Sequence, residues 1–239
     1  MFEYPSAGST NDLAHDLPAW TAVRAGTQSG GRGRFGRVFV SDPGGLWISA
    51  VLPAEGSLQS WAGFSLMVGI HLVRMLEGLE VPGARLRWPN DLMSGPKKLG
   101  GLLIEQSSRQ TLIVGLGLNV KNAPWAIDPG LDPISTSLER VCGNSGRGVP
   151  DVFEMAVRTL NALADAHQEM QEGGMAAAIR ELNARWIPPV PVRLQLPDGA
   201  CQEGRFAGLD PVGNLRLLDA AGSEILVPHQ SVEKLIEIY

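Results

Sequence analysis

The stretch RWPNDL (residues 87–92), followed by KKLGG (residues 97–101), gathers an amide, a carboxylate and two lysines around a proline. Pro89 disfavours a helical conformation of the residue before it, so the stretch should end a strand and then turn. Asn and Asp commonly cap such turns, and adjacent lysines in a loop commonly face solvent. Asp91 could instead accept a hydrogen bond from a ligand, and Lys98, nearer the next strand, could reach a pocket.

A second unusual run precedes it, GRGRFGR (residues 31–37), which contains the spacing of the dinucleotide fingerprint G-x-G-x-x-G. That fingerprint requires a helix directly after the glycines. Here the β-branched and turn-forming sequence VFVSDP (residues 38–43) follows, which argues against a Rossmann site. Three arginines among glycines are either a solvated basic loop or a loop that closes over phosphate or carboxylate. We favour the second interpretation.

The whole chain sets limits on its partners. It has 239 residues with 44% hydrophobic content, enough for one large domain or a large and a small one. Its net charge of -5 argues against general nucleic-acid binding, so the basic loop points to a small anionic ligand. The two cysteines, Cys142 and Cys201, are far apart in sequence and are expected to be reduced.

No segment predicts export or membrane insertion. The first residues lack a basic start and an apolar run, and the apolar stretch 61–79 contains His71, Arg74 and Glu77. We therefore expect a cytoplasmic protein that does not contact a membrane.

Helical spacing of apolar residues predicts three main helices. The first covers residues 57–79 with Ser57 as N-cap, and the second covers residues 151–171 after a capping box. A shorter helix is expected over residues 175–185.

β-branched and apolar runs predict strands at residues 46–52, 102–105 and 111–114, with residues 107–110 as a hairpin loop between the last two. The stretch 121–150 is expected to be mostly loop, with a short helix starting near residues 135–138.

The composition changes at IPPVP (residues 187–191), which is interpreted as a semi-rigid linker. Beyond it, short strands alternate with turn signals at residues 198–199, 211–214 and 221–223, which favours a small closed barrel.

Taken together, these motifs resemble those of biotin–protein ligases. A Ser-Thr-Asn element matches residues 9–11, and the glutamine and the glycine–arginine loop match Gln28 and residues 31–37. A Lys-Trp-Pro-Asn-Asp segment matches residues 87–91, and the Lys-Leu-Ala-Gly element after it matches residues 98–101. A Gly-x-Gly-x-Asn segment matches residues 115–119.

The resemblance implies an α+β fold, a mixed sheet with helices as in class II aminoacyl-tRNA synthetases, closed by an SH3-like barrel. Residues 1–187 would form the catalytic domain and residues 188–239 the barrel, which could dock a carrier protein or cover ATP. It implies that biotin and MgATP give biotinyl-5′-AMP, which then biotinylates one lysine of a biotin carboxyl carrier protein. No tightly bound organic cofactor is expected, and both a monomer and a homodimer remain open.

Roles follow from the matched positions. The resemblance implies that Arg34 and Lys98 stabilise the α-phosphate charge, and that Asp91 helps to hold magnesium with ATP. Biotin would be bound by Ser9, Thr10, Gln28, Gly31, Arg32, Lys98, Gly101 and Leu103. ATP would be bound by Arg34, Arg37, Phe39, Asn90, Asp91 and Asn119.

Four positions depart from the family pattern, one of them Gly100, which stands where the family has alanine. Phe35 replaces an arginine and is expected to face solvent or cap the loop, whereas Arg87 replaces a lysine and changes the donor geometry. Phe39 stands where the family has an adenine-stacking tryptophan. We still expect activity, because these changes leave Arg32, Arg34 and Lys98 intact.

Two other functions compete. A lipoate–protein ligase has a related fold, but the Trp-Pro-Asn-Asp run argues against it. A non-catalytic module that holds the carrier protein is the other, and the intact Lys98 and arginines argue against that. Some relatives carry an N-terminal DNA-binding domain, but the Ser-Thr-Asn element starts at residue 9, so no specific DNA binding is expected.

Overall fold

A computed structural model describes residues 1–55, 61–107, 110–143, 148–186 and 190–238. Its main feature is a seven-stranded mixed sheet in the order β1-β2-β3-β7-β6-β5-β4. The first pair, β1 and β2, is parallel and the others are antiparallel. The strands are β1 (Phe2–Tyr4), β2 (Thr21–Ala25), β3 (Leu46–Pro53), β4 (Ala84–Arg87), β5 (Asp91–Ser94), β6 (Lys97–Ser107) and β7 (Thr111–Leu118).

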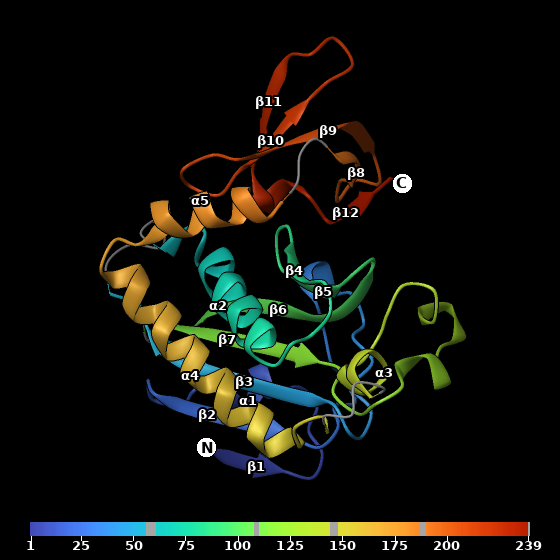
Figure 1. Cartoon of the computed structure of the whole chain (residues 1–239). Coiled ribbons are helices and arrows are strands. Elements are labelled where there is room, and N and C mark those ends of the chain that lie inside the picture. The colour runs from blue at the N-terminus through green and yellow to red at the C-terminus, as the bar shows by residue number, and fades with distance from the viewer. Residues whose placement is uncertain (56–60, 108–109, 144–147, 187–189, 239) are drawn as a thin grey trace.

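Helices cover both faces of this sheet (Figure 1). Helices α2 (Phe64–Gly78) and α4 (Val152–Gln171) pack together on one face, and the short α1 (Thr10–Ala14) contacts β2, β3 and β7. Strand β3 is buried over nearly its whole length because it lies between these layers. The small core under α1 consists of Ala14, Val23, Val51 and Ile113, with Leu17 packed against it.

The second sheet is smaller, with five strands in the order β11-β10-β9-β8-β12, and it lies at the end of the molecule beside α5 (Met175–Arg185) (Figure 1). The strands are β8 (Val190–Gln195), β9 (Cys201–Leu209), β10 (Leu215–Leu218), β11 (Glu224–Val227) and β12 (Lys234–Glu237). The hairpin predicted at residues 198–199 joins β8 to β9. Closure into an SH3-like barrel stays a prediction, as does the domain boundary at residues 187/188.

The two sheets share one hydrophobic core. Trp186 stacks on Phe206 of β9 with ring centroids 4.0 Å apart, and the Trp88 indole N–H donates to the carbonyl of Gly213 at 3.0 Å. A single cluster of buried side chains extends from α2 and β4 to β8 and β12. The small sheet is therefore held against the large one by packing.

Most predicted helices are confirmed. Helix α4 begins after Asp151, whose carboxylate accepts the backbone N–H of Glu154 at 2.8 Å, and α5 has the predicted bounds. The short α3 (Leu138–Cys142) follows Ser137, which caps it. These ends were predictable because side-chain caps and glycines determine them locally.

The predicted start of the helix over residues 57–79 is wrong. Helix α2 begins at Phe64, after Gly63, which has φ 81° and so interrupts the helical conformation. Trp61 instead packs into the core and donates its indole N–H to the carbonyl of Glu55. Ser57, the predicted cap, lies outside the described residues.

The strands 46–52, 102–105 and 111–114 are confirmed, and β6 and β7 are longer than predicted. The loop expected at Lys97 and Lys98 is wrong, because Gly95, with φ 56°, and Pro96 form a two-residue turn and both lysines begin β6. The linker predicted at 187–191 is wrong at Val190 and Pro191, which open β8; residues 187–189 lie outside the described residues.

Further elements are short 3-10 turns, η1 (Arg34–Gly36), η3 (Pro124–Ala126), η4 (Pro129–Leu131) and η5 (His229–Ser231). Both cysteines are thiols outside any disulfide, as predicted. Within the described ranges, no helix combines the length and the apolar character that crossing a membrane requires.

Candidate active site

Two adjoining cavities lie between the glycine–arginine loop and the sheet. The narrow pocket runs over β6 and β7 under residues 31–37, and the large cavity, of about 470 Å³, extends from β5 and β6 toward the small sheet. Three side chains line both cavities and therefore mark their junction: Arg37, Phe39 and Lys98.

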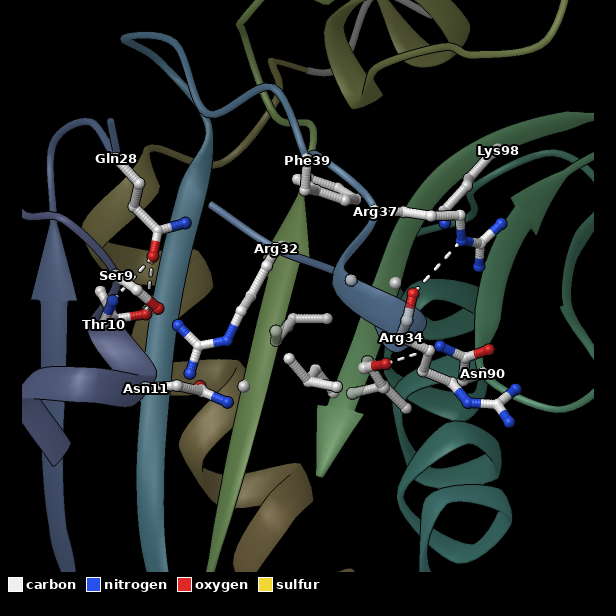
Figure 2. Close-up of a pocket in the computed structure, with 17 residues that line it drawn as sticks. Ser9, Thr10, Asn11, Gln28, Arg32, Arg34, Arg37, Phe39, Asn90 and Lys98 are labelled. Atoms are coloured by element: carbon white, nitrogen blue, oxygen red, sulfur yellow. Dashed lines mark hydrogen bonds between the residues drawn. The ribbon is translucent and has the colours of Figure 1, made fainter. Parts of the chain in front are cut away.

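One end of the narrow pocket is a hydrogen-bonded polar cluster (Figure 2). Gln28 Oε1 accepts from the Thr10 backbone N–H at 2.8 Å and from its hydroxyl at 3.1 Å, and Gln28 Nε2 donates to Ser41 Oγ at 3.0 Å. The buried Ser49 hydroxyl lies 2.7 Å from Thr10 Oγ1 and 2.6 Å from Asn11 Oδ1. These contacts hold polar groups in fixed positions, where they could form hydrogen bonds with a polar ring of a small ligand.

Arg32 lies across the narrow pocket between this cluster and β7 (Figure 2). Its guanidinium is 2.7 Å from Asp12 Oδ1 and 3.2 Å from Glu105 Oε2, and Asn11 Nδ2 donates to the same Glu105 oxygen at 2.6 Å. The hydrogen bond to Asp12 outweighs burial and raises the Arg32 pKa. The free volume of the narrow pocket is about 40 Å³, so a ligand must displace side chains to enter it.

At the junction, Asp91 is paired with two cations. Its Oδ1 is 2.5 Å from Lys98 Nζ and its Oδ2 is 2.7 Å from Arg87 Nη2. Burial raises the Asp91 pKa, but the charges of Lys98 and Arg87 outweigh it and lower the pKa to about 2. Asp91 is therefore ionised at neutral pH and holds Lys98 in place.

Arg34 lines the narrow pocket and has one unpaired guanidinium donor. One guanidinium nitrogen, Nη2, donates to the carbonyl of His229, whereas Nη1 is buried without a hydrogen-bond partner among the described residues. Burial and the nearby Arg37 lower the Arg34 pKa. A buried N–H without an acceptor is costly, so this group is suited to an anionic ligand.

Phe39 separates the two cavities and lies against a glycine of β7. A Cβ added at Gly117 would be 2.7 Å from Phe39 Cε1, so the missing side chain gives the ring its space. The ring packs edge-on against Trp47, and Lys98 Nζ lies 5.5 Å from its centroid. This position would let the ring face a planar base or the junction itself.

The sequence-predicted residues divide between the cavities. The narrow pocket is lined by Ser9, Thr10, Gln28, Arg32, Arg34, Asn90, Gly101 and Leu103, together with the three junction residues. Asp91 and Asn119 line the large cavity. Asn90 thus lies on the narrow side, with its amide donating to the carbonyl of Leu102 at 2.6 Å.

Gly31 lines neither cavity, but a Cβ there would be 2.5 Å from the Phe39 carbonyl and from Ser41 Oγ. Its role is to let the loop approach the chain at residues 39–41. Phe35 is 47% exposed, as expected, and it stacks on the Arg34 guanidinium at 5.1 Å.

Sequence reasoning missed several residues at the site. Asn11 belongs to the Ser-Thr-Asn element but received no role, and a charge within an apolar strand could have indicated Glu105. Gly115 and Gly117 line the narrow pocket, where their missing side chains make room for Asn11 and Phe39. Lys234, on the wall of the large cavity, had no sequence signal.

The described residues hold no group of three or more His, Cys, Asp or Glu side chains suited to a metal ion. Both Asp91 oxygens are already paired with cations. This donor set fits magnesium that arrives on nucleotide phosphates rather than a resident metal, because Mg²⁺ binds through few protein carboxylates plus phosphate oxygens.

The α+β fold and the cation-lined junction between two cavities are features to compare with known protein families. Residues 9–119 match the model of the Biotin/lipoate A/B protein ligase family. A solved structure, biotin protein ligase from Aquifex aeolicus in complex with biotin and ATP, superposes with a TM-score of 0.82 and 26% identity, covering 99% of this chain and 98% of that one.

Curated relatives narrow the assignment. Biotin--[acetyl-CoA-carboxylase] ligase from Paracoccus denitrificans is 31% identical over 228 residues, covering 90% of each chain. The chain belongs to the biotin–protein ligase family. Bifunctional ligase/repressor BirA from Bacillus subtilis is 33% identical over 145 residues, 56% of this chain and 45% of that protein. The match thus spans less than half the length of that relative.

Proposed function

We propose that this chain adenylates biotin with MgATP and transfers the biotinyl group to a lysine of a biotin carboxyl carrier protein. The observation that carries the proposal is the junction, where Arg37, Phe39 and Lys98 line both cavities. An acid in the narrow pocket and a nucleotide in the large cavity would meet at these residues. The Aquifex aeolicus relative, solved with biotin and ATP, supports this choice of ligands.

In the first step, a biotin carboxylate oxygen attacks the α-phosphorus, and the bond to the pyrophosphate oxygen breaks. Two anions approach each other, so fixed cationic donors lower the barrier. Lys98, held by Asp91, and Arg34, with its unpaired Nη1, would supply those donors. The carboxylate is already ionised, so this step needs no general base.

In the second step, the neutral ε-amine of the carrier lysine attacks the anhydride carbonyl carbon, and AMP leaves with the electrons of the broken C–O bond. The attacking nitrogen releases one proton to water, which leaves a neutral amide. The mixed anhydride reacts readily with water, so the loop over residues 31–37 would protect it until the carrier arrives. Magnesium enters as part of the substrate MgATP and shields phosphate charge; Asp91 as a direct magnesium ligand stays a prediction.

Individual roles are part of the proposal. The cluster around Gln28 would bind the biotin ring, with Arg32 moving from Asp12 to cover the ligand. Phe39 and Asn119 would bind the nucleotide base. The remaining predicted contacts are Ser9, Thr10, Gly31, Gly101 and Leu103 for biotin, and Arg37, Asn90 and Asp91 for ATP.

We also infer a cytoplasmic protein without specific DNA binding, with a catalytic domain over residues 1–187 and a barrel over 188–239. The two reduced cysteines support a reducing compartment, and the net charge of -5 argues against a nucleic-acid surface. A gel shift at moderate salt that detects binding to one specific DNA sequence would contradict this inference.

The test is ATP–pyrophosphate exchange by the purified chain with magnesium, comparing biotin, lipoate and octanoate. Exchange that depends on biotin alone is the expected result. Exchange with lipoate would assign the chain to the lipoate branch of the family, and exchange with no acid would favour a module that merely holds the carrier. Transfer is then followed as mass gain on a purified carrier domain and on its lysine-to-arginine variant.

A further inference from the structure

The small C-terminal sheet forms part of the wall of the large cavity. Lys234 and Ile236, both on β12, line this cavity. Between them Leu235 is buried in the core at 2% exposure, and side chains alternate along a strand. The pleat of β12 therefore directs Lys234 away from the core and into the cavity.

Lys234 is surrounded by positive charge. The cavity is also lined by Arg37, Arg87 and Lys98, of which the last two share the carboxylate of Asp91. Burial, followed by the charges of Arg87 and Arg37, lowers the Lys234 pKa. A partly buried ammonium beside guanidinium groups is unfavourable unless an anion joins it.

The other acidic residues of the cavity do not neutralise Lys234. Glu237 forms a two-point ion pair with Arg85, at 2.7 and 2.6 Å, and Asp128 caps η4 through the N–H of Gly130. Across the described residues, neither an ion pair nor a hydrogen bond joins a carboxylate to Lys234. An anionic ligand would supply the missing counter-charge.

The position of Lys234 indicates which part of a nucleotide it meets. Lys234 lines the large cavity but not the narrow pocket, whereas the reacting α-phosphate must lie at the junction of the two. The base would fit the apolar part of the cavity wall, formed by Pro124, Leu131, Pro133 and Ile134. A compact ammonium away from both suits the outer phosphates, which carry the largest charge.

We propose that Lys234 binds the β- and γ-phosphates of ATP and holds the pyrophosphate after the α-phosphorus–oxygen bond breaks. It is a nucleotide-binding residue that remains an ammonium throughout. The proposal rests on the proposed function, since it assigns one more residue to the same nucleotide site. It gives the small sheet a direct part in ATP binding, besides packing.

The experiment measures equilibrium binding of MgATP, AMP, inorganic pyrophosphate and biotin to the full chain and to Lys234→Ala by calorimetry. Loss of one charge-assisted hydrogen bond should weaken MgATP and pyrophosphate about tenfold or more. Binding of AMP and biotin should stay within about twofold, because neither ligand reaches Lys234 (a factor of two is about 0.4 kcal/mol). Lys234→Arg keeps the charge and should recover most of the affinity.

Arg205→Ala is the matched control, because Arg205 is an exposed cation on β9 of the same sheet and lies outside both cavities. It should bind all four ligands like the unaltered chain. Circular dichroism melts identify any variant that fails to fold, and Lys234→Gln, which removes the charge but keeps much of the side chain, then replaces Lys234→Ala. A selective loss of MgATP and pyrophosphate affinity in that variant supports the proposal, and normal pyrophosphate affinity or an equal loss for AMP overturns it.

Two results overturn the proposal. One is an Ala variant that binds pyrophosphate normally, and the other is an equal loss for AMP and pyrophosphate. Both are independent of turnover, so they are separable from failure of the proposed function. A chain that binds MgATP through Lys234 but shows no biotin-dependent exchange would refute the ligase assignment and leave the Lys234 assignment standing.

Discussion

Lys98 is one of the three residues that line both cavities, and both proposed ligands would contact it. It is the second residue of β6, its ammonium is held by Asp91, and it lies 5.5 Å from the Phe39 ring centroid. We predict that Lys98→Ala lowers biotin-dependent pyrophosphate exchange about 100-fold or more, because the α-phosphate loses a preorganised charge. The readout is kcat for exchange at saturating biotin and ATP.

The neighbouring residue offers the control. Lys97 donates to the carbonyl of Asp132 on the exposed side of β6 and lines neither cavity. Lys97→Ala should exchange at close to the normal rate. Equal losses in the two variants would show that β6 needs its lysines for structure and would refute a catalytic role for Lys98.

The Asp91 carboxylate links the site to acid stability. Its pKa is about 2 in the folded chain and has a reference value of 3.8, so the ion pairs stabilise the fold above pH 4. As pH falls from about 4 to about 2, this contribution of about 2 kcal/mol should be lost. The Asp91→Asn variant has no carboxylate at this position and lacks this contribution at every pH. The difference in free energy of unfolding between the two proteins should therefore shrink as the pH falls from about 4 to about 2.

Urea unfolding at several pH values between 3 and 7 measures this difference directly. A difference that is the same at pH 3 and pH 6 would mean that Asp91 gains nothing from Lys98 and Arg87.

Strand β7 shapes the site through a glycine, whose missing side chain leaves space for a neighbouring ring. Gly117 leaves room for the Phe39 ring, and a Cβ there would meet that ring at 2.7 Å. We predict that Gly117→Ala raises KM for biotin and ATP about tenfold, the scale of a modest overpacking penalty. Gly78→Ala, at the last residue of α2 with open space around it, should leave both KM values unchanged.

Elements with local signals were predictable from sequence, and elements positioned by distant contacts were less so. Asp151 caps α4 by accepting the backbone N–H of Glu154, so the cap depends only on residues that are neighbours in sequence. The start of α2 depends on the positive φ of Gly63 and on the packing of Trp61, which spacing alone does not reveal. Lys97 and Lys98 were predicted to lie in a loop. The turn between β5 and β6 consists only of Gly95 and Pro96, so both lysines already belong to β6.

The same distinction holds for the candidate site. Motifs within residues 9–37 and 87–119 predicted most of the lining of the narrow pocket, because each motif keeps its own residues close together, but they predicted less of the large cavity. Contacts between motifs were not predictable, such as Arg32 with Glu105 or Arg34 with the carbonyl of His229. Lys234 lies more than a hundred residues from the other cations, so the fold alone brings it to them.

At the scale of the molecule, the two sheets share their core and should unfold together. Trp88 and Trp186 join the large sheet and α5 to the small sheet, and Arg85 pairs with Glu237 of β12. We predict one cooperative thermal transition, in which calorimetric and van't Hoff enthalpies agree and ligands are not required. Two separable transitions, or a folded and soluble chain 190–239, would contradict a shared core.

The junction has a thermodynamic consequence for the whole molecule. Arg37, Phe39 and Lys98 each belong to both cavities, so a ligand that moves them on one side alters the binding surface on the other. Such coupling is reciprocal by necessity: whatever factor the acid exerts on nucleotide affinity, the nucleotide exerts on the acid. Occupancy of the two cavities is therefore a cooperative property, and the affinity measured for either ligand alone understates or overstates its affinity in the ternary complex.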